Sequence, residues 1–84
     1  PHTVRMVFAE PNPAVKPGDR VFDVVLQGEV VFSDLDVVAE AGGPMRVIVR
    51  TWRSVPVGDA LEVELRPKSR FAPVLSGVEI SRQM

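Results

Sequence analysis

The chain has no cysteine and no tyrosine, and it has one histidine and one tryptophan among its 84 residues. Without cysteine there are no disulfides, no thiol catalysis and no thiolate metal sites. His2 is not accompanied by a serine and an acid at a recognisable spacing, which argues against a nucleophilic relay. The sequence therefore predicts a protein that is not an enzyme, with no catalytic residue, no metal site and no cofactor.

A charge bias and long hydrophobic runs are also missing. Ten basic and eleven acidic residues give a net charge of −1, whereas a nucleic-acid-binding domain of this size usually carries a basic excess. The apolar runs are far shorter than the roughly 20 residues that span a bilayer. We therefore expect neither a nucleic-acid partner nor membrane insertion. An apolar fraction of 45% and a charged fraction of 25% are typical of one folded domain over residues 1–84.

Alternation of apolar and polar residues is the main structural pattern. Residues 61–66 (LEVELR) alternate without a break, and Val4, Met6 and Phe8 share one face of their segment. No window shows the periodicity of a long helix, and prolines and glycines fall mainly between the apolar segments. The pattern predicts an all-β antiparallel sandwich or jelly roll. The expected strands lie near residues 2–10, 20–27, 29–33, 46–54, 60–66 and 74–82, with a tight hairpin turn at Gly28.

Four short motifs give the chain a family likeness. They are VFDV at 21–24, QG at 27–28, DLDV at 34–37 and SGVEI at 76–80. In this order they resemble the second half of a malectin or malectin-like domain. The resemblance implies a galactose-binding-domain-like jelly roll, and an incomplete one, because a full domain of the family is about twice as long.

The same resemblance implies a function. Malectin-like domains are non-catalytic carbohydrate-binding modules, found as accessory domains of larger secreted or surface proteins such as glycoside hydrolases. It implies an oligosaccharide or polysaccharide partner, of glucose type, and an extracellular, cell-surface or periplasmic location. Two departures weaken the likeness at the sugar site. The loop after Phe8-Ala9-Glu10 contains Pro11-Asn12-Pro13 instead of aromatics, and an acid expected before the last strand is missing.

Sugar recognition requires an aromatic plate rimmed by polar groups, and few residues here can supply one. Trp52 is expected to share a strand face with Arg46 and Arg50, as a stacking patch or as a cap on the sandwich edge. Phe71 and Arg70, in the loop before the last strand, form the best predicted rim together with Asn12; the alternative is a solvated loop with one residue tucked inward. The candidate carbohydrate-binding residues are Asn12, Trp52, Arg70 and Phe71.

Carboxylates within the expected strands have two interpretations. Asp34 and Asp36, two residues apart, either share a cation such as calcium or bond nearby backbone N–H groups, and the second is favoured. Asp23 lies in an apolar strand and must be paired if that strand is central, with Arg20, Arg5 or Arg46 as expected partners.

Two other functions stay open from the sequence. Half a sandwich leaves sheet edges and an apolar face uncovered, so the chain would self-associate or pair with a chain that supplies the missing strands, without binding sugar. An immunoglobulin-like protein-binding domain is the third possibility, and it would show a different strand order.

Overall fold

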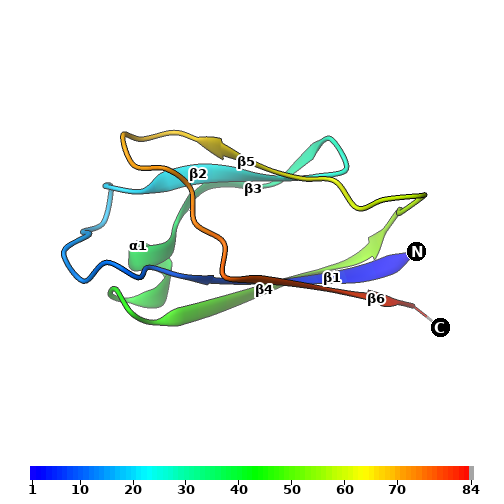
Figure 1. The fold of residues 1–84 in the computed structure, drawn as a ribbon, viewed down its shortest axis with the longest axis horizontal. Helices are drawn as coiled ribbons and strands as arrows, with labels where there is room; N and C mark the ends of the chain where they lie inside the picture. Colours follow the sequence, from blue (N-terminus) through cyan, green and yellow to red (C-terminus); the bar gives the residue numbers. More distant parts are fainter. Residues whose placement is uncertain (84) are drawn as a thin grey trace.

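The computed structural model describes residues 1–83 as two facing antiparallel sheets (Figure 1). The sheet orders are β4-β1-β6 and β3-β2-β5. The elements are β1 (His2–Ala9), β2 (Val21–Leu26), β3 (Glu29–Asp36), α1 (Val37–Ala41), β4 (Val47–Val55), β5 (Val63–Pro67) and β6 (Gly77–Arg82). The predicted all-β antiparallel sandwich is therefore confirmed. No helix within residues 1–83 is long and apolar enough to cross a membrane.

The core lies between the two central strands, β1 and β2. Val4, Met6 and Phe8 alternate along β1 and are fully buried, and Phe22 and Val24 of β2 are buried opposite them. The rings of Phe8 and Phe22 meet with centroids 6.0 Å apart. Burying these side chains supplies most of the driving force that holds the two layers together, at roughly 1.5–3 kcal/mol for each large apolar residue.

A two-residue turn joins β2 to β3 and sets their register. Gln27 and Gly28 have φ of 52° and 80°, and positive φ at both central positions defines the tight hairpin turn whose twist matches paired strands. The predicted role of Gly28 is confirmed. Gln27 adopts the same region at some steric cost, because it has a Cβ.

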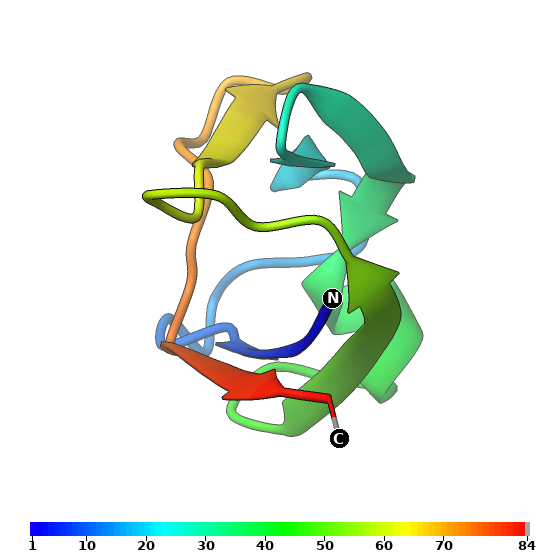
Figure 2. The ribbon, with the colours of Figure 1, turned by 90° about the vertical axis from the view of Figure 1, so that its right-hand side faces the viewer.

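The segment after β3 differs from the sequence prediction. β3 continues to Asp36 rather than ending at residue 33, and the short helix α1 follows it directly. Asp36 caps α1 by accepting a hydrogen bond from the Ala39 N–H at 3.1 Å, and Gly42 ends the helix with φ of 79°. The helix contacts β1, β3 and β4, so it covers the side of the sandwich where β3 and β4 lie (Figure 2).

Candidate functional site

The structure separates the four predicted sugar-binding residues into two groups. Trp52 lies on β4, in a hollow that it shares with residues of β2 and β3. Asn12 lies in the loop of residues 10–20, and Arg70 and Phe71 lie in the segment 68–76. The loop 10–20 and the start of the segment 68–76 lie at the end of the molecule opposite the β2–β3 hairpin (Figure 1), and Arg20 of the first contacts Ala72 of the second. Trp52 therefore cannot form one site with the other three.

Trp52 is held on the inner face of its sheet. It pairs with the fully buried Val4 across the β1–β4 ladder, and it packs against the core while staying partly exposed. Arg50 shares this face, but its guanidinium donates to Glu40 at 3.0 Å and lies 5.9 Å from the Phe32 ring. The expected patch of Trp52 with arginines is therefore not formed with Arg50.

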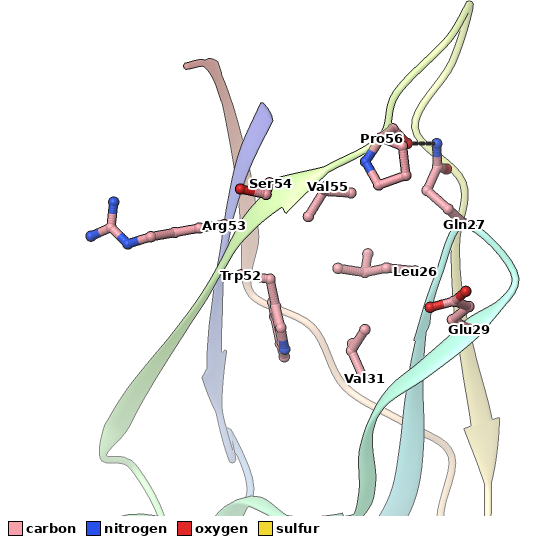
Figure 3. Close-up of a pocket in the computed structure, with 9 residues that line it drawn as sticks. All are labelled: Leu26, Gln27, Glu29, Val31, Trp52, Arg53, Ser54, Val55 and Pro56. Atoms are coloured by element: carbon pink, nitrogen blue, oxygen red, sulfur yellow. Dashed lines mark hydrogen bonds between the residues drawn. The ribbon is translucent and has the colours of Figure 1, made fainter. Parts of the chain in front are cut away.

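We call the space beside this tryptophan the Trp52 hollow. It has a volume of about 210 Å³ and is lined by Leu26, Gln27, Glu29, Val31, Trp52, Arg53, Ser54, Val55 and Pro56. Figure 3 shows the apolar side chains converging on it from both sheets, while the Arg53 side chain extends away. The hollow is therefore an apolar space between the layers with an aromatic wall.

The rim of the Trp52 hollow is fixed by one amide. Gln27 donates to the Pro56 carbonyl at 2.8 Å, and its side-chain oxygen accepts from the Glu62 N–H at 2.6 Å. These bonds tie the segment 56–62 to the β2–β3 hairpin. The exposed Glu29 carboxylate lies at the rim and makes no hydrogen bond or ion pair with any residue from 1 to 83, so it is available to accept from a ligand.

Ser54 adds a strained backbone position to the same rim. Its φ of 57° lies in the left-handed region, which costs a residue with a Cβ about 1–2 kcal/mol. Such positions persist where the surroundings enforce them, and they gather at binding sites. The Ser54 N–H donates to the side-chain oxygen of Gln83, so the end of β4 is tied to the segment after β6 beside the hollow.

At the opposite end, a buried ion pair joins the two loops. Glu10 is fully buried, and its carboxylate lies 2.6 Å from Nε of Arg20. Arg20 also donates to the Ala72 carbonyl, and its Cζ lies 5.4 Å from the Phe71 ring centroid. The loop of residues 10–20 is thus clamped to the segment 68–76.

The predicted rim residues take part in this clamp. The Asn12 N–H donates to Glu10 at 3.1 Å, and the Asn12 side-chain oxygen accepts from the Ala14 N–H at 2.9 Å. The Arg70 guanidinium lies 5.7 Å from the Phe71 ring. Two guanidinium groups thus compete with a sugar for the faces of Phe71, so this end is a poorer stacking site than the Trp52 hollow.

Asp23 is paired as expected, but with a different partner. It accepts from the Asp34 N–H at 2.9 Å, and its carboxylate lies 3.6 Å from Nζ of Lys68. The predicted arginine partners were wrong, since Arg20 binds Glu10, Arg5 binds Glu79 at 3.1 Å, and the Arg46 side chain lies beside Gly42 and Gly43.

Lys68 forms ion pairs with two carboxylates at once. Its Nζ also lies 3.4 Å from Asp34, and the hydrogen bond to Asp34 and the charge of Asp23 raise the pKa of Lys68 above its ordinary value of 10.5. Asp36 instead accepts from backbone N–H groups, at Ala39 and at Gly18 (2.6 Å). Asp36 therefore bonds backbone N–H groups, as the favoured interpretation expected, whereas the Asp34 carboxylate is paired with Lys68 instead. No group of three metal-ligating side chains occurs within residues 1–83.

Comparison with known proteins now decides the family. The model of the Malectin domain matches residues 2–68. This chain belongs to the malectin domain family. That family binds carbohydrate, and the assignment removes the immunoglobulin-like alternative. The match includes β1 to β5 and Trp52, whereas Arg70, Phe71 and β6 lie outside it.

A curated relative supports the same assignment. "Receptor-like protein 4" of Arabidopsis thaliana is 32% identical over 80 residues, which cover 94% of this malectin-domain chain and 13% of that protein. The chain thus spans about an eighth of the length of the relative. No solved structure matches the chain significantly.

Proposed function

We propose that this malectin-domain chain is a non-catalytic carbohydrate-binding module that holds one sugar ring in the Trp52 hollow. The observation that carries the proposal is the juxtaposition of an aromatic wall, an apolar floor and an unpaired carboxylate around a space of about 210 Å³. The C–H face of a pyranose would lie against Trp52, and its hydroxyls would donate to Glu29 at the rim.

The size and rigidity of the hollow define the ligand class. Its volume is below the roughly 300–1,000 Å³ of pockets that enclose drug-sized molecules, so it suits a single terminal ring. The hydrogen bonds of Gln27 fix the rim before binding, which reduces the ordering cost of association. Glucose oligomers are the first ligands to test, and longer glycans would extend outward past Glu29.

The setting of the module is a larger protein at the cell surface or outside the cell. The relative is named as a receptor-like protein and is several times longer than this chain, which supports an accessory recognition domain beside other domains. In that setting the module would position its parent protein on a glycan.

The single tryptophan makes the proposal directly testable. Titration of the chain with glucose oligomers and a panel of other glycans should change Trp52 fluorescence saturably. Glu29→Gln removes the charge that accepts sugar hydroxyls, and a hydrogen bond to a charged group contributes about 1.5–3 kcal/mol. We therefore expect affinity to fall by about tenfold or more.

Phe71→Ala is the matched control at the opposite end. It should leave affinity unchanged if the sugar lies in the Trp52 hollow. Loss of binding in Phe71→Ala with full binding in Glu29→Gln would place the site at the loops instead. No saturable response to any glycan, by fluorescence and by calorimetry, would contradict carbohydrate binding altogether.

A further inference from the structure

The charged side chains around the Trp52 hollow present negative charge to it. One acid, Glu29, and one base, Arg53, line the hollow. In Figure 3, Glu29 lies across the hollow from Trp52, whereas the Arg53 side chain extends away. The charge that faces a ligand in the hollow is therefore that of the Glu29 carboxylate.

A second hollow adjoins the first at Gln27, which lines both. We call it the Asp59 hollow. It has a volume of about 370 Å³ and is lined by Gln27, Gly58, Asp59, Ala60 and Glu62. Two further carboxylates, with no basic side chain of residues 1–83 among the lining groups, therefore stand beside the rim of the Trp52 hollow.

The carboxylates of these two hollows differ from all others in the chain. Of the eleven acids, Asp19 and Asp36 accept from backbone N–H groups. Those in ion pairs are Glu10, Asp23, Asp34, Glu40, Glu64 and Glu79. The three that remain, Glu29, Asp59 and Glu62, have no side-chain partner within residues 1–83, and all three line the adjoining hollows. Negative charge without a counter-ion is thus gathered at one place.

This arrangement favours a cation on a flat ring. A cleft lined by one sign of charge focuses the field and concentrates ligands of the opposite charge. The Trp52 ring adds to the effect, because the face of an aromatic ring is negative. Figure 3 shows this ring edge-on, with one face turned toward Val31 and Glu29.

We propose that the Trp52 hollow selects a protonated amino sugar of the glucosamine type over neutral and acidic sugars. The inference rests on the proposed function, in which this hollow holds one sugar ring. The C–H face of the ring would lie against Trp52, and its ammonium group would donate to Glu29. The ammonium group of the next ring, where the glycan passes over the rim, would lie at the Asp59 hollow.

The form of the two hollows distinguishes an amino sugar from other cations. A space of about 210 Å³ with an aromatic wall suits one ring, whereas a lysine side chain or a polyamine has no ring face to lay against Trp52. The carboxylates of the adjoining Asp59 hollow match a ligand whose charge repeats on each ring. Uronic acids carry the opposite charge, so the same carboxylates would repel them.

Titrations with ligands of equal length and linkage test this selectivity. Trp52 fluorescence is followed with trimers of glucosamine, N-acetylglucosamine and glucose, at a mildly acidic pH that keeps the sugar amine protonated. An exposed ion pair changes affinity by up to about fivefold, so the glucosamine trimer should bind about fivefold tighter or more than the glucose trimer. N-Acetylation, which removes the charge, should abolish the advantage. So should about 1 M salt, where the Debye length is about 3 Å.

A double variant, Asp59→Asn with Glu62→Gln, isolates the carboxylates of the Asp59 hollow. Both side chains are exposed, so the fold should be retained, which circular dichroism verifies. The ratio of the affinities for the glucosamine and glucose trimers should fall by about twofold or more. Glu40→Gln is the matched control, because it removes the same charge from α1, outside both hollows, and should keep the ratio of the parent chain.

The outcomes separate this inference from the proposed function. Equal binding of the glucosamine and glucose trimers would overturn the selectivity and leave carbohydrate binding intact. Trilysine that binds as tightly as the glucosamine trimer would overturn it in favour of general attraction of polycations. An unchanged affinity ratio in the double variant would refute the part assigned to Asp59 and Glu62. The absence of a response to any glycan would contradict the sugar site itself.

Discussion

At the scale of single residues, the buried carboxylate of Glu10 is the group whose loss should lower the free energy of unfolding most. It lies at the end of β1 without solvent contact, and Arg20 supplies its counter-charge at 2.6 Å. Arg20 then reaches Ala72 and Phe71, so one ion pair holds two loops that are far apart in sequence. Removing one partner of such a pair leaves an uncompensated polar group inside the protein.

We therefore predict that Glu10→Gln destabilises the fold by about 3 kcal/mol, at the lower end of the range for broken buried pairs because Arg20 keeps some solvent contact. Urea unfolding followed by Trp52 fluorescence measures this free energy of unfolding. Glu40→Gln is the control, since Glu40 and Arg50 form an exposed pair at 3.0 Å and its loss should cost less than about 1 kcal/mol. Equal effects of the two substitutions would show that the Glu10 pair is not a structural clamp.

The sequence contained a signal for Glu10 that the prediction did not use. Val4, Met6 and Phe8 alternate on the inner face, and Glu10 is the next position of the same parity. An acid at a core-facing position requires a cation, and this requirement identifies Glu10 as paired. Which cation it is depends on how the two loops meet, and that arrangement is set by the sheet topology rather than by local pattern.

The candidate site shows the same division between local and long-range information. Trp52 was identified from the sequence as an aromatic on an amphipathic strand. Its neighbours in the hollow, Leu26, Val31 and Glu29, come from the opposite sheet, and nothing in the local pattern of β4 indicates them. The grouping of Asn12 with Arg70 and Phe71 as a sugar rim remains a prediction, although Arg20 does join the two loops that carry them.

At the scale of elements, alternation predicts every strand within residues 1–83, whereas it does not predict the helix α1. All six expected strands exist, because alternating residues on a two-layer fold give a clear period of two. The helix α1 has five residues, which is less than two turns and too short to show a helical period. The two ends of α1 do have a sequence signature, because a capping aspartate, Asp36, precedes the helix and a glycine, Gly42, follows it.

Asp36 joins the helix to a neighbouring loop, so its side chain should contribute more to stability than an ordinary helix cap does. One carboxylate oxygen accepts from Ala39 at 3.1 Å, and the other accepts from Gly18 at 2.6 Å. Asp36→Ala should lower the free energy of unfolding by about 2 kcal/mol, about 1 for each bond. Asp36→Asn keeps one acceptor oxygen and should lose about half as much, which thermal unfolding can resolve. An alanine variant as stable as the parent would show that neither bond contributes.

At the scale of the whole molecule, the sandwich is elongated, and the helix α1 covers it only on the side of β3 and β4. Its radius of gyration is 13.1 Å, whereas a compact chain of this length is expected near about 12 Å. Its extents of 41 × 21 × 15 Å describe a thin slab. A chain of this size buries only about 60% of its unfolded surface even when compact. The partial exposure of Val78 (41%) and Ile80 (45%) on β6 therefore lowers the hydrophobic stabilisation that a small domain depends on.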